Sequence, residues 1–144
     1  MPANTTPIYP LTPKVSWGAL TAANTAKDGT GTVATLFTAG ANGARIDQIK
    51  ARALGTNVAT VLRLFINNGS ANSTAANNSL IHEATIAATT LSEVAALADN
   101  DITITKGANV VPPIQFLPAG YKIMAAIGTA VTAGLQITVS GADY

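Results

Sequence analysis

Reactive side chains are scarce in this chain of 144 residues, which has no cysteine, one histidine and only 10% charged residues. Without cysteine there can be no disulfide framework, no thiolate nucleophile and no cysteine-based zinc site. His82, Glu83, Glu93 and five aspartates are the main candidates for acid/base or metal chemistry. We therefore expect no catalytic residue, no cofactor and no metal site, and a structural or binding module rather than an enzyme.

The chain is also poor in aromatic residues, which make up 5% of it, and its formal net charge is only +1. A core with so few aromatics is built from Ile, Leu, Val and three Phe, which suits two closely packed sheets. A chain with almost no net charge lacks the basic field that attracts phosphate backbones, so no nucleic-acid partner is expected. The sequence has no uncharged apolar run long enough to cross a bilayer and no basic, apolar leader, so we expect no membrane insertion.

What the chain has is period-two alternation of apolar and small polar residues between Gly-rich turns. This pattern predicts eight or nine strands without long amphipathic helices, and hence an all-β fold, an antiparallel β-sandwich. Jelly-roll connectivity is preferred because the strand number suits two four-stranded sheets, and an immunoglobulin-like sandwich stays possible. Two hairpins are predicted, one joining residues 45–54 to 58–67 and one joining residues 121–131 to 135–141. The sandwich is predicted to be a single domain over residues 15–144.

Three segments depart from the alternation. Residues 67–79 are small and polar, which predicts a long exposed loop that either binds a partner or is simply mobile. Thr90 with Glu93 matches a capping box, which predicts one or two helical turns in residues 90–100. Pro112 and Pro113 confine their segment to an edge or bulged strand.

Residues 1–14 are rich in proline, which favours an extended arm over a helix or a central strand. A frayed terminus is the alternative interpretation of such a segment. Ile8, Tyr9 and Leu11 give the arm apolar anchors, so we predict that it lies on a partner surface.

Three cations are the other candidate binding residues. Lys50, Arg52 and Arg63 fall on two neighbouring predicted strands, which would place them together on the exposed face of one sheet. Such a face could dock onto an acidic partner, although a solvated face is the default explanation. His82 and Glu83 are neighbours in a predicted strand, so they point to opposite faces and cannot form a relay.

Aromatic side chains suggest one more kind of site. Trp17, Tyr9, Tyr121 and Tyr144 could form a platform on which sugar rings stack. Core or interface packing is the alternative for aromatics scattered in this way along the chain.

Residues 43–69 (GARIDQIKARALGTNVATVLRLFINNG) and 117–144 (LPAGYKIMAAIGTAVTAGLQITVSGADY) resemble small virion proteins of tailed bacteriophages. The resemblance implies a jelly-roll decoration or cement protein that binds the outside of a capsid and staples neighbouring subunits. It further implies the major capsid protein as partner, a homo-oligomer such as a dimer or trimer, no cofactor, and synthesis in the bacterial host cytoplasm. A phage tail or head-completion component and a carbohydrate-binding β-sandwich module are the alternatives.

Overall fold

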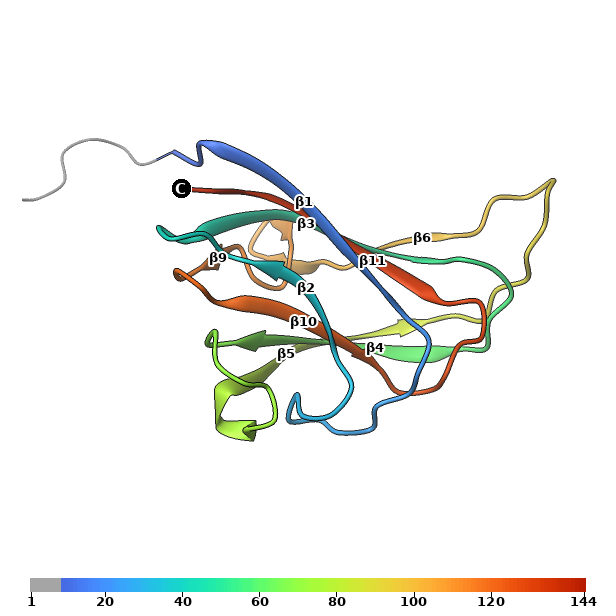
Figure 1. Cartoon of the computed structure of the whole chain (residues 1–144). Coiled ribbons are helices and arrows are strands. Elements are labelled where there is room, and N and C mark those ends of the chain that lie inside the picture. The colour runs from blue at the N-terminus through green and yellow to red at the C-terminus, as the bar shows by residue number, and fades with distance from the viewer. Residues whose placement is uncertain (1–8) are drawn as a thin grey trace, which may run out of the picture.

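Two antiparallel sheets form the body of the protein in a computed structural model that describes residues 9–144 (Figure 1). Sheet A has the order β1 (Thr12–Leu20), β11 (Leu135–Asp143), β3 (Ala44–Ala53) and β6 (Asp99–Asp101), and β9 (Phe116–Leu117) also pairs with β3. Sheet B has the order β2 (Ala34–Thr38), β10 (Lys122–Ile127), β4 (Thr60–Asn67) and β5 (Asn78–Ile86). The all-β sandwich expected from the alternation is confirmed.

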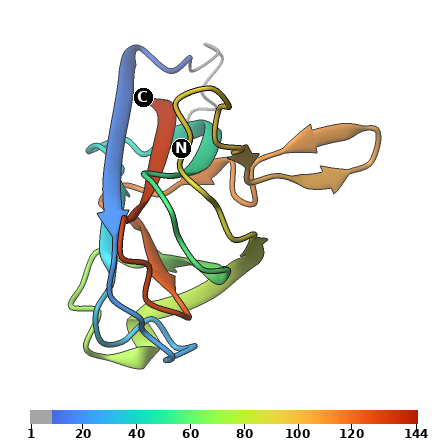
Figure 2. The same cartoon turned by 90° about the vertical axis from the view of Figure 1, so that its right-hand side faces the viewer.

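The connectivity of the two sheets is that of a jelly roll. Taken in chain order without β7, β8 and β9, the strands of sheet A are the first, eighth, third and sixth, and those of sheet B are the second, seventh, fourth and fifth. This alternation between sheets is the double Greek key of jelly rolls. The remaining strands, β7 (Ile104–Lys106) and β8 (Asn109–Val111), form a hairpin that projects from the body (Figure 2).

A single main core lies between the sheets. Its fully buried side chains are aliphatic apart from Phe37, and they include Ile49 and Ile137 of sheet A and Leu62, Leu64 and Ile127 of sheet B. A second, smaller cluster of Phe65, Met124 and Ala126 lies on the other face of sheet B. These three residues are also buried, because Val33 and Leu80 pack against them.

Both predicted hairpins are wrong. β3 and β4 follow each other along the chain but belong to different sheets, and the same is true of β10 and β11. Each connection crosses from one sheet to the other, so consecutive strands face each other across the core instead of pairing. Alternation separates the two faces of a strand, but it carries no information about which neighbour pairs with it.

The helical turns predicted for residues 90–100 are also absent, and these residues form bends that lead into β6. Leu91 and Val94 are 54% and 96% exposed. A helix here would have no surface on which to bury its apolar side. The loop predicted at residues 67–79 is present between β4 and β5 and contains one turn of 3₁₀ helix, η1 (Ala75–Asn77). The segment expected to form one edge or bulged strand is instead broken at Pro112 and Pro113, which separate β8 from β9, because proline has no N–H to donate to a strand ladder.

Asparagine side chains order the loops that cover sheet B. Asn24 donates to the carbonyl oxygens of Thr30 and Thr32, and Asn72 donates to those of Gly29 and Gly31. The carboxamide of Asn72 thereby links the loop after β4 to the loop before β2. The long polar loop is therefore held by specific hydrogen bonds despite its low complexity.

Candidate functional site

Over most of β1 the outward side is apolar and the inward side is polar, the reverse of an ordinary sandwich strand. Tyr9, Leu11, Val15 and Trp17 are 68%, 79%, 59% and 64% exposed. Together with the exposed Pro13 they alternate with the inward residues of the same segment. The strand thus presents an apolar stripe to solvent. Ile8, the remaining predicted anchor of the arm, lies outside the described residues.

The inward side of β1 closes the edge of the sandwich. Lys14 forms an ion pair with Asp143 at 3.1 Å, and its ammonium lies 4.8 Å from the centre of the Phe37 ring. Lys14 and Ser16 also donate hydrogen bonds to the main-chain carbonyls of Thr38 and Leu36 in β2. These contacts occupy the polar side of the strand, so only the apolar stripe is left for a partner. β1 begins at Thr12, inside the segment expected to be an arm, because that part of the segment pairs with β11.

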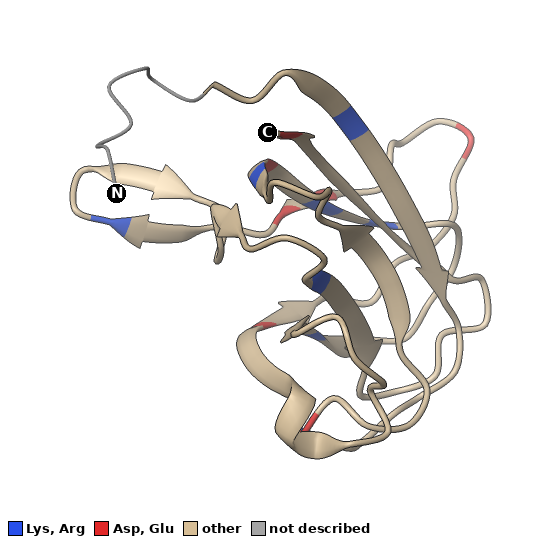
Figure 3. Cartoon of the chain, turned by 60° about the vertical axis from the view of Figure 1, so that its left-hand side comes forward, with Lys and Arg blue, Asp and Glu red and all other residues tan. Residues whose placement is uncertain are grey.

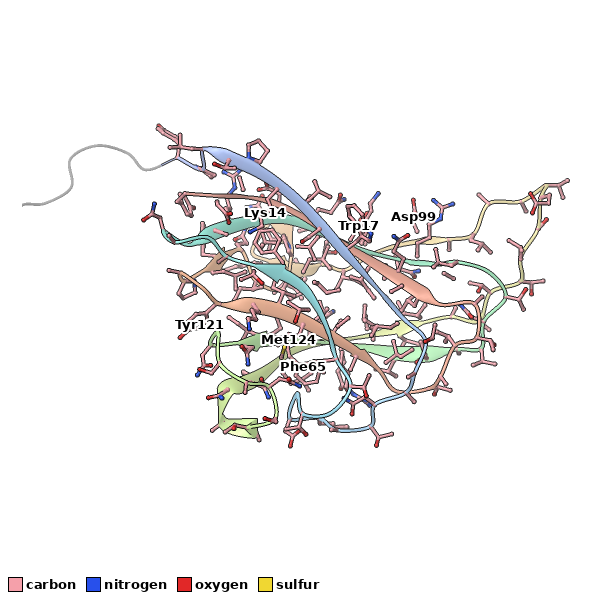
Figure 4. The ribbon with its side chains drawn as sticks, viewed as in Figure 1. Lys14, Trp17, Phe65, Asp99, Tyr121 and Met124 are labelled. Atoms are coloured by element: carbon pink, nitrogen blue, oxygen red, sulfur yellow. The ribbon has the colours of Figure 1, made fainter. Side chains whose placement is uncertain are left out.

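Strand register arranges the outer face of sheet A in rows, because residues directly opposite each other in neighbouring strands share a face. The central row contains Trp17, Thr138, Lys50 and Asp101. The row toward the start of β1 contains Val15, Ser140 and Gln48, and the row on the other side contains Ala19, Gln136, Arg52 and Asp99. The face therefore changes from apolar on β1, through uncharged polar side chains on β11, to mostly charged side chains on β3 and β6. Trp17 and Asp99 lie along this sheet, and Phe65 and Met124 lie along sheet B (Figure 4).

Opposite charges compensate each other on this face. Arg52 forms an ion pair with Asp99 at 3.3 Å, and Gln48 donates to Asp101 at 3.1 Å. Lys50 lies directly opposite Asp101 in the register. Charged side chains are sparse and scattered over the described chain as a whole (Figure 3). The predicted cationic surface is thus reduced to two residues, Lys50 and Arg52, each beside a carboxylate.

Arg63 does not join Lys50 and Arg52, and this prediction is wrong because β3 and β4 lie in different sheets. Its side chain is only 11% exposed and lies on the outer face of sheet B, where it donates to Glu83 at 2.8 Å. It also donates to the carbonyl oxygen of Asn24 at 3.0 Å. The hydrogen bond from Arg63 holds the pKa of Glu83 below its usual value. Arg63 is therefore a structural residue that ties the loop before β2 to the sheet.

One end of sheet A gathers further exposed apolar residues. The outermost rows connect Thr12, Asp143, Ala44 and Leu117, and Pro13, Ala142, Arg45 and Phe116. Phe116 is 62% exposed, and Val110 on the neighbouring hairpin is 68% exposed. A cavity of about 470 Å³ lies at the hairpin base, lined by both hairpin strands and by residues 112–116. We call the exposed residues Tyr9, Leu11, Val110 and Phe116, together with this cavity, the arm end of the protein.

The four aromatics do not form a common sugar-stacking platform. Tyr121 is half-buried and packs against the main core, and Tyr144 is half-buried at the end of the chain. Trp17 and Tyr9 share the outward side but are eight residues apart on an extended segment. None of these three tyrosines therefore lies beside Trp17.

Titratable groups are dispersed over the described residues. His82 lies opposite Leu64 on the core side of sheet B, and Glu83 lies opposite Arg63 on the outer side, so the two point apart as predicted. Residues 9–144 contain no group of three His, Cys, Asp or Glu side chains suited to hold a metal ion. Within the same residues, no helix has the length and apolar character needed to cross a bilayer.

Comparison of the chain with protein-family models, with curated proteins and with solved structures finds no match. Function is therefore inferred from the surface itself. The exposed apolar stripe could not be found from periodicity, since alternation marks two faces without saying which one is buried.

Proposed function

We propose that this protein is a structural virion protein of the capsid decoration or cement type, which attaches to the major capsid protein of a tailed phage through its arm end. The observation that carries the proposal is the exposure of Tyr9, Leu11 and Phe116 at the same end of sheet A. Apolar residues gathered in one exposed region are typical of protein interaction surfaces.

The geometry of the arm end suits attachment across a seam between subunits. Leu11 precedes β1, and Phe116 lies in β9, on the far side of β11 and β3. The strand that follows Leu11 and the strand that contains Phe116 are thus separated by three inter-strand spacings of about 4.8 Å each. The hairpin β7–β8 extends the contact area beyond the edge of the sheet (Figure 2). A partner contacted at separate points is stapled more firmly than one contacted at a single point, because the second contact becomes intramolecular.

Many weak contacts are sufficient for such a role. On a particle that offers many equivalent sites, a homo-oligomer engages several sites at once and its avidity exceeds the affinity of each contact. We therefore propose that the protein acts as a dimer or trimer on the capsid exterior after synthesis in the host cytoplasm. Light scattering of the purified chain measures the oligomeric state directly.

The experiment that tests attachment mixes the purified protein with capsids lacking their accessory protein and counts bound copies by electron cryomicroscopy. The first variant deletes residues 1–10, which spares the pairing of Thr12 with Asp143 in β1. The second carries Leu11→Asp and Phe116→Asp. Both should fold, and both should bind far fewer copies per particle, because the contact loses its apolar anchors.

Val94→Asp is the matched control. Val94 is 96% exposed in the loop between β5 and β6, which lies at the opposite end of the sandwich from the start of β1 (Figure 1). The same chemical change there should leave occupancy unaltered. Full occupancy by both arm-end variants would refute the proposal, and binding of the intact protein to tails or head-completion vertices would favour that alternative instead.

A further inference from the structure

Trp17 is the single tryptophan of the chain, and it lies in the middle of the outer face of sheet A rather than at the arm end. Its 64% exposure leaves the indole available to a ligand. Val15 and Ala19 are exposed on the same side of β1, so the ring lies within a narrow apolar strip. An indole face attracts the C–H groups on the apolar side of a pyranose ring, because the π-system is negative and those hydrogens are positive.

Polar groups extend from the indole in the direction that such a ligand would require. Thr138 is the next residue in the central row, followed by Lys50 and Asp101. The row spans three inter-strand spacings of about 4.8 Å each. Thr138 both donates and accepts, Lys50 donates and Asp101 accepts. A sugar hydroxyl also donates and accepts at once, so a mixed row of this kind matches a chain of hydroxyl groups better than a row of one type.

The charges on the face select among ligands that could stack on an indole. Two cations, Lys50 and Arg52, are balanced by two anions, Asp99 and Asp101. A nucleic acid, a sulfated glycan or a sialylated glycan would need an excess of positive charge, which this face lacks. We propose that the outer face of sheet A around Trp17 binds a neutral oligosaccharide.

This site is separate from the surface assigned to attachment. Trp17 is six residues from Leu11 along an extended segment, or about 20 Å. A protein attached through its arm end would keep the middle of sheet A accessible. Glycan binding by the purified protein also requires no particle. The two proposals therefore stand or fall independently.

The single tryptophan makes the test direct, since all tryptophan emission comes from Trp17. Purified protein is titrated with neutral hexose and N-acetylhexosamine oligosaccharides, and with sulfated and sialylated counterparts. A neutral oligosaccharide that stacks on the indole should shift the emission to shorter wavelength and protect it from acrylamide quenching. Affinities are then measured by isothermal titration calorimetry, which needs no tryptophan.

Variants separate stacking from the polar contacts. Trp17→Ala should weaken binding about tenfold by calorimetry, in keeping with the loss of one aromatic contact. Thr138→Ala and Asp101→Ala retain the tryptophan and should weaken binding several-fold in the fluorescence titration. Phe116→Ala removes an exposed aromatic side chain from the arm end of the same sheet and should leave the affinity unchanged.

Several results would overturn the proposal. One is that no neutral oligosaccharide alters the emission or the quenching of Trp17. Another is tighter binding of sulfated or sialylated glycans than of their neutral counterparts, and a third is that Phe116→Ala and Trp17→Ala weaken binding equally. Burial of Trp17 on capsids together with no glycan binding would identify the same face as a protein contact and would also refute the site.

Discussion

Asn24 should be sensitive to substitution, because its buried carboxamide makes three hydrogen bonds within one loop. Its Nδ2 donates to Thr30 and Thr32 at 2.7 and 2.8 Å, and its Oδ1 accepts from the amide of Ala26 at 3.0 Å. Asn24→Ala removes all three bonds. At about 1 kcal/mol each, the gross loss is about 3 kcal/mol.

Water reduces this figure, because Ala26 and Thr30 are only half-buried and Thr32 is exposed. We expect a net loss of about 2 kcal/mol in the free energy of unfolding, or a decrease of about 6 °C in Tm. Urea unfolding followed by far-ultraviolet circular dichroism measures the loss. Limited trypsin digestion should also detect faster cleavage after Lys27, which is exposed in the loosened loop.

Two further variants make the test specific. Asn77→Ala removes a carboxamide that also bonds within a loop but is accessible to solvent. It should cost less than about 1 kcal/mol. Asn24→Asp keeps the acceptor but places a carboxylate against two carbonyl oxygens. We expect a raised pKa for the new carboxyl group, so this variant should regain stability as the pH falls. If Asn24→Ala and Asn77→Ala destabilise equally, the argument for a buried network is refuted.

Urea unfolding also tests three other features of the fold. Gly141→Ala should cost about 3 kcal/mol, because its Cβ would collide with the main-chain carbonyl of Arg45 in β3. Gly107→Ala is the control, with a positive φ but nothing within 4 Å of the new Cβ, and it should cost only about 1 kcal/mol. Phe65→Ala should cost about 4 kcal/mol although Phe65 lies outside the main core, and a loss below about 1 kcal/mol would contradict the second cluster. The lowered pKa of Glu83 stabilises the folded state above its usual pKa of 4.5, and this stability is lost as the pH falls through the folded pKa. Unfolding measured from pH 6 to pH 3 should therefore show a steeper loss in the wild type than in Glu83→Gln, and identical pH profiles would argue against the contact with Arg63.

The composition and alternation of the sequence predicted the class of the fold correctly. Residues such as Ile49 and Ala51 alternate with Gln48 and Lys50, and the structure buries the first pair and directs the second outward. The polar loop after β4 was also predictable, because a run of Asn, Ser and Ala cannot bury enough apolar surface to form core. Its attachment to the loop before β2 was not, since the hydrogen bonds from Asn72 to the carbonyls of Gly29 and Gly31 connect residues more than 40 positions apart.

Partner choice between strands was beyond the sequence. The hairpins predicted for residues 45–54 with 58–67 and for residues 121–131 with 135–141 treated short connections as turns within one sheet. In the structure each connection crosses the sandwich, because a jelly roll pairs strands that are distant in the chain, such as β1 with β11. The same error led to the prediction that Arg63 shares a face with Lys50 and Arg52, whereas β3 and β4 lie in different sheets.

The candidate site also separates into features that the sequence determined and features that only the tertiary structure decided. The sequence by itself determined that reactive groups are few and that β1 has one apolar and one polar side, since both follow from residue identity and a period of two. Only the tertiary structure decided that the polar side faces inward, because Lys14 and Ser16 find acceptors on β2 and the carboxylate of Asp143 only once the sandwich has closed. The exposure of Trp17, on which the glycan proposal depends, is a consequence of those long-range contacts.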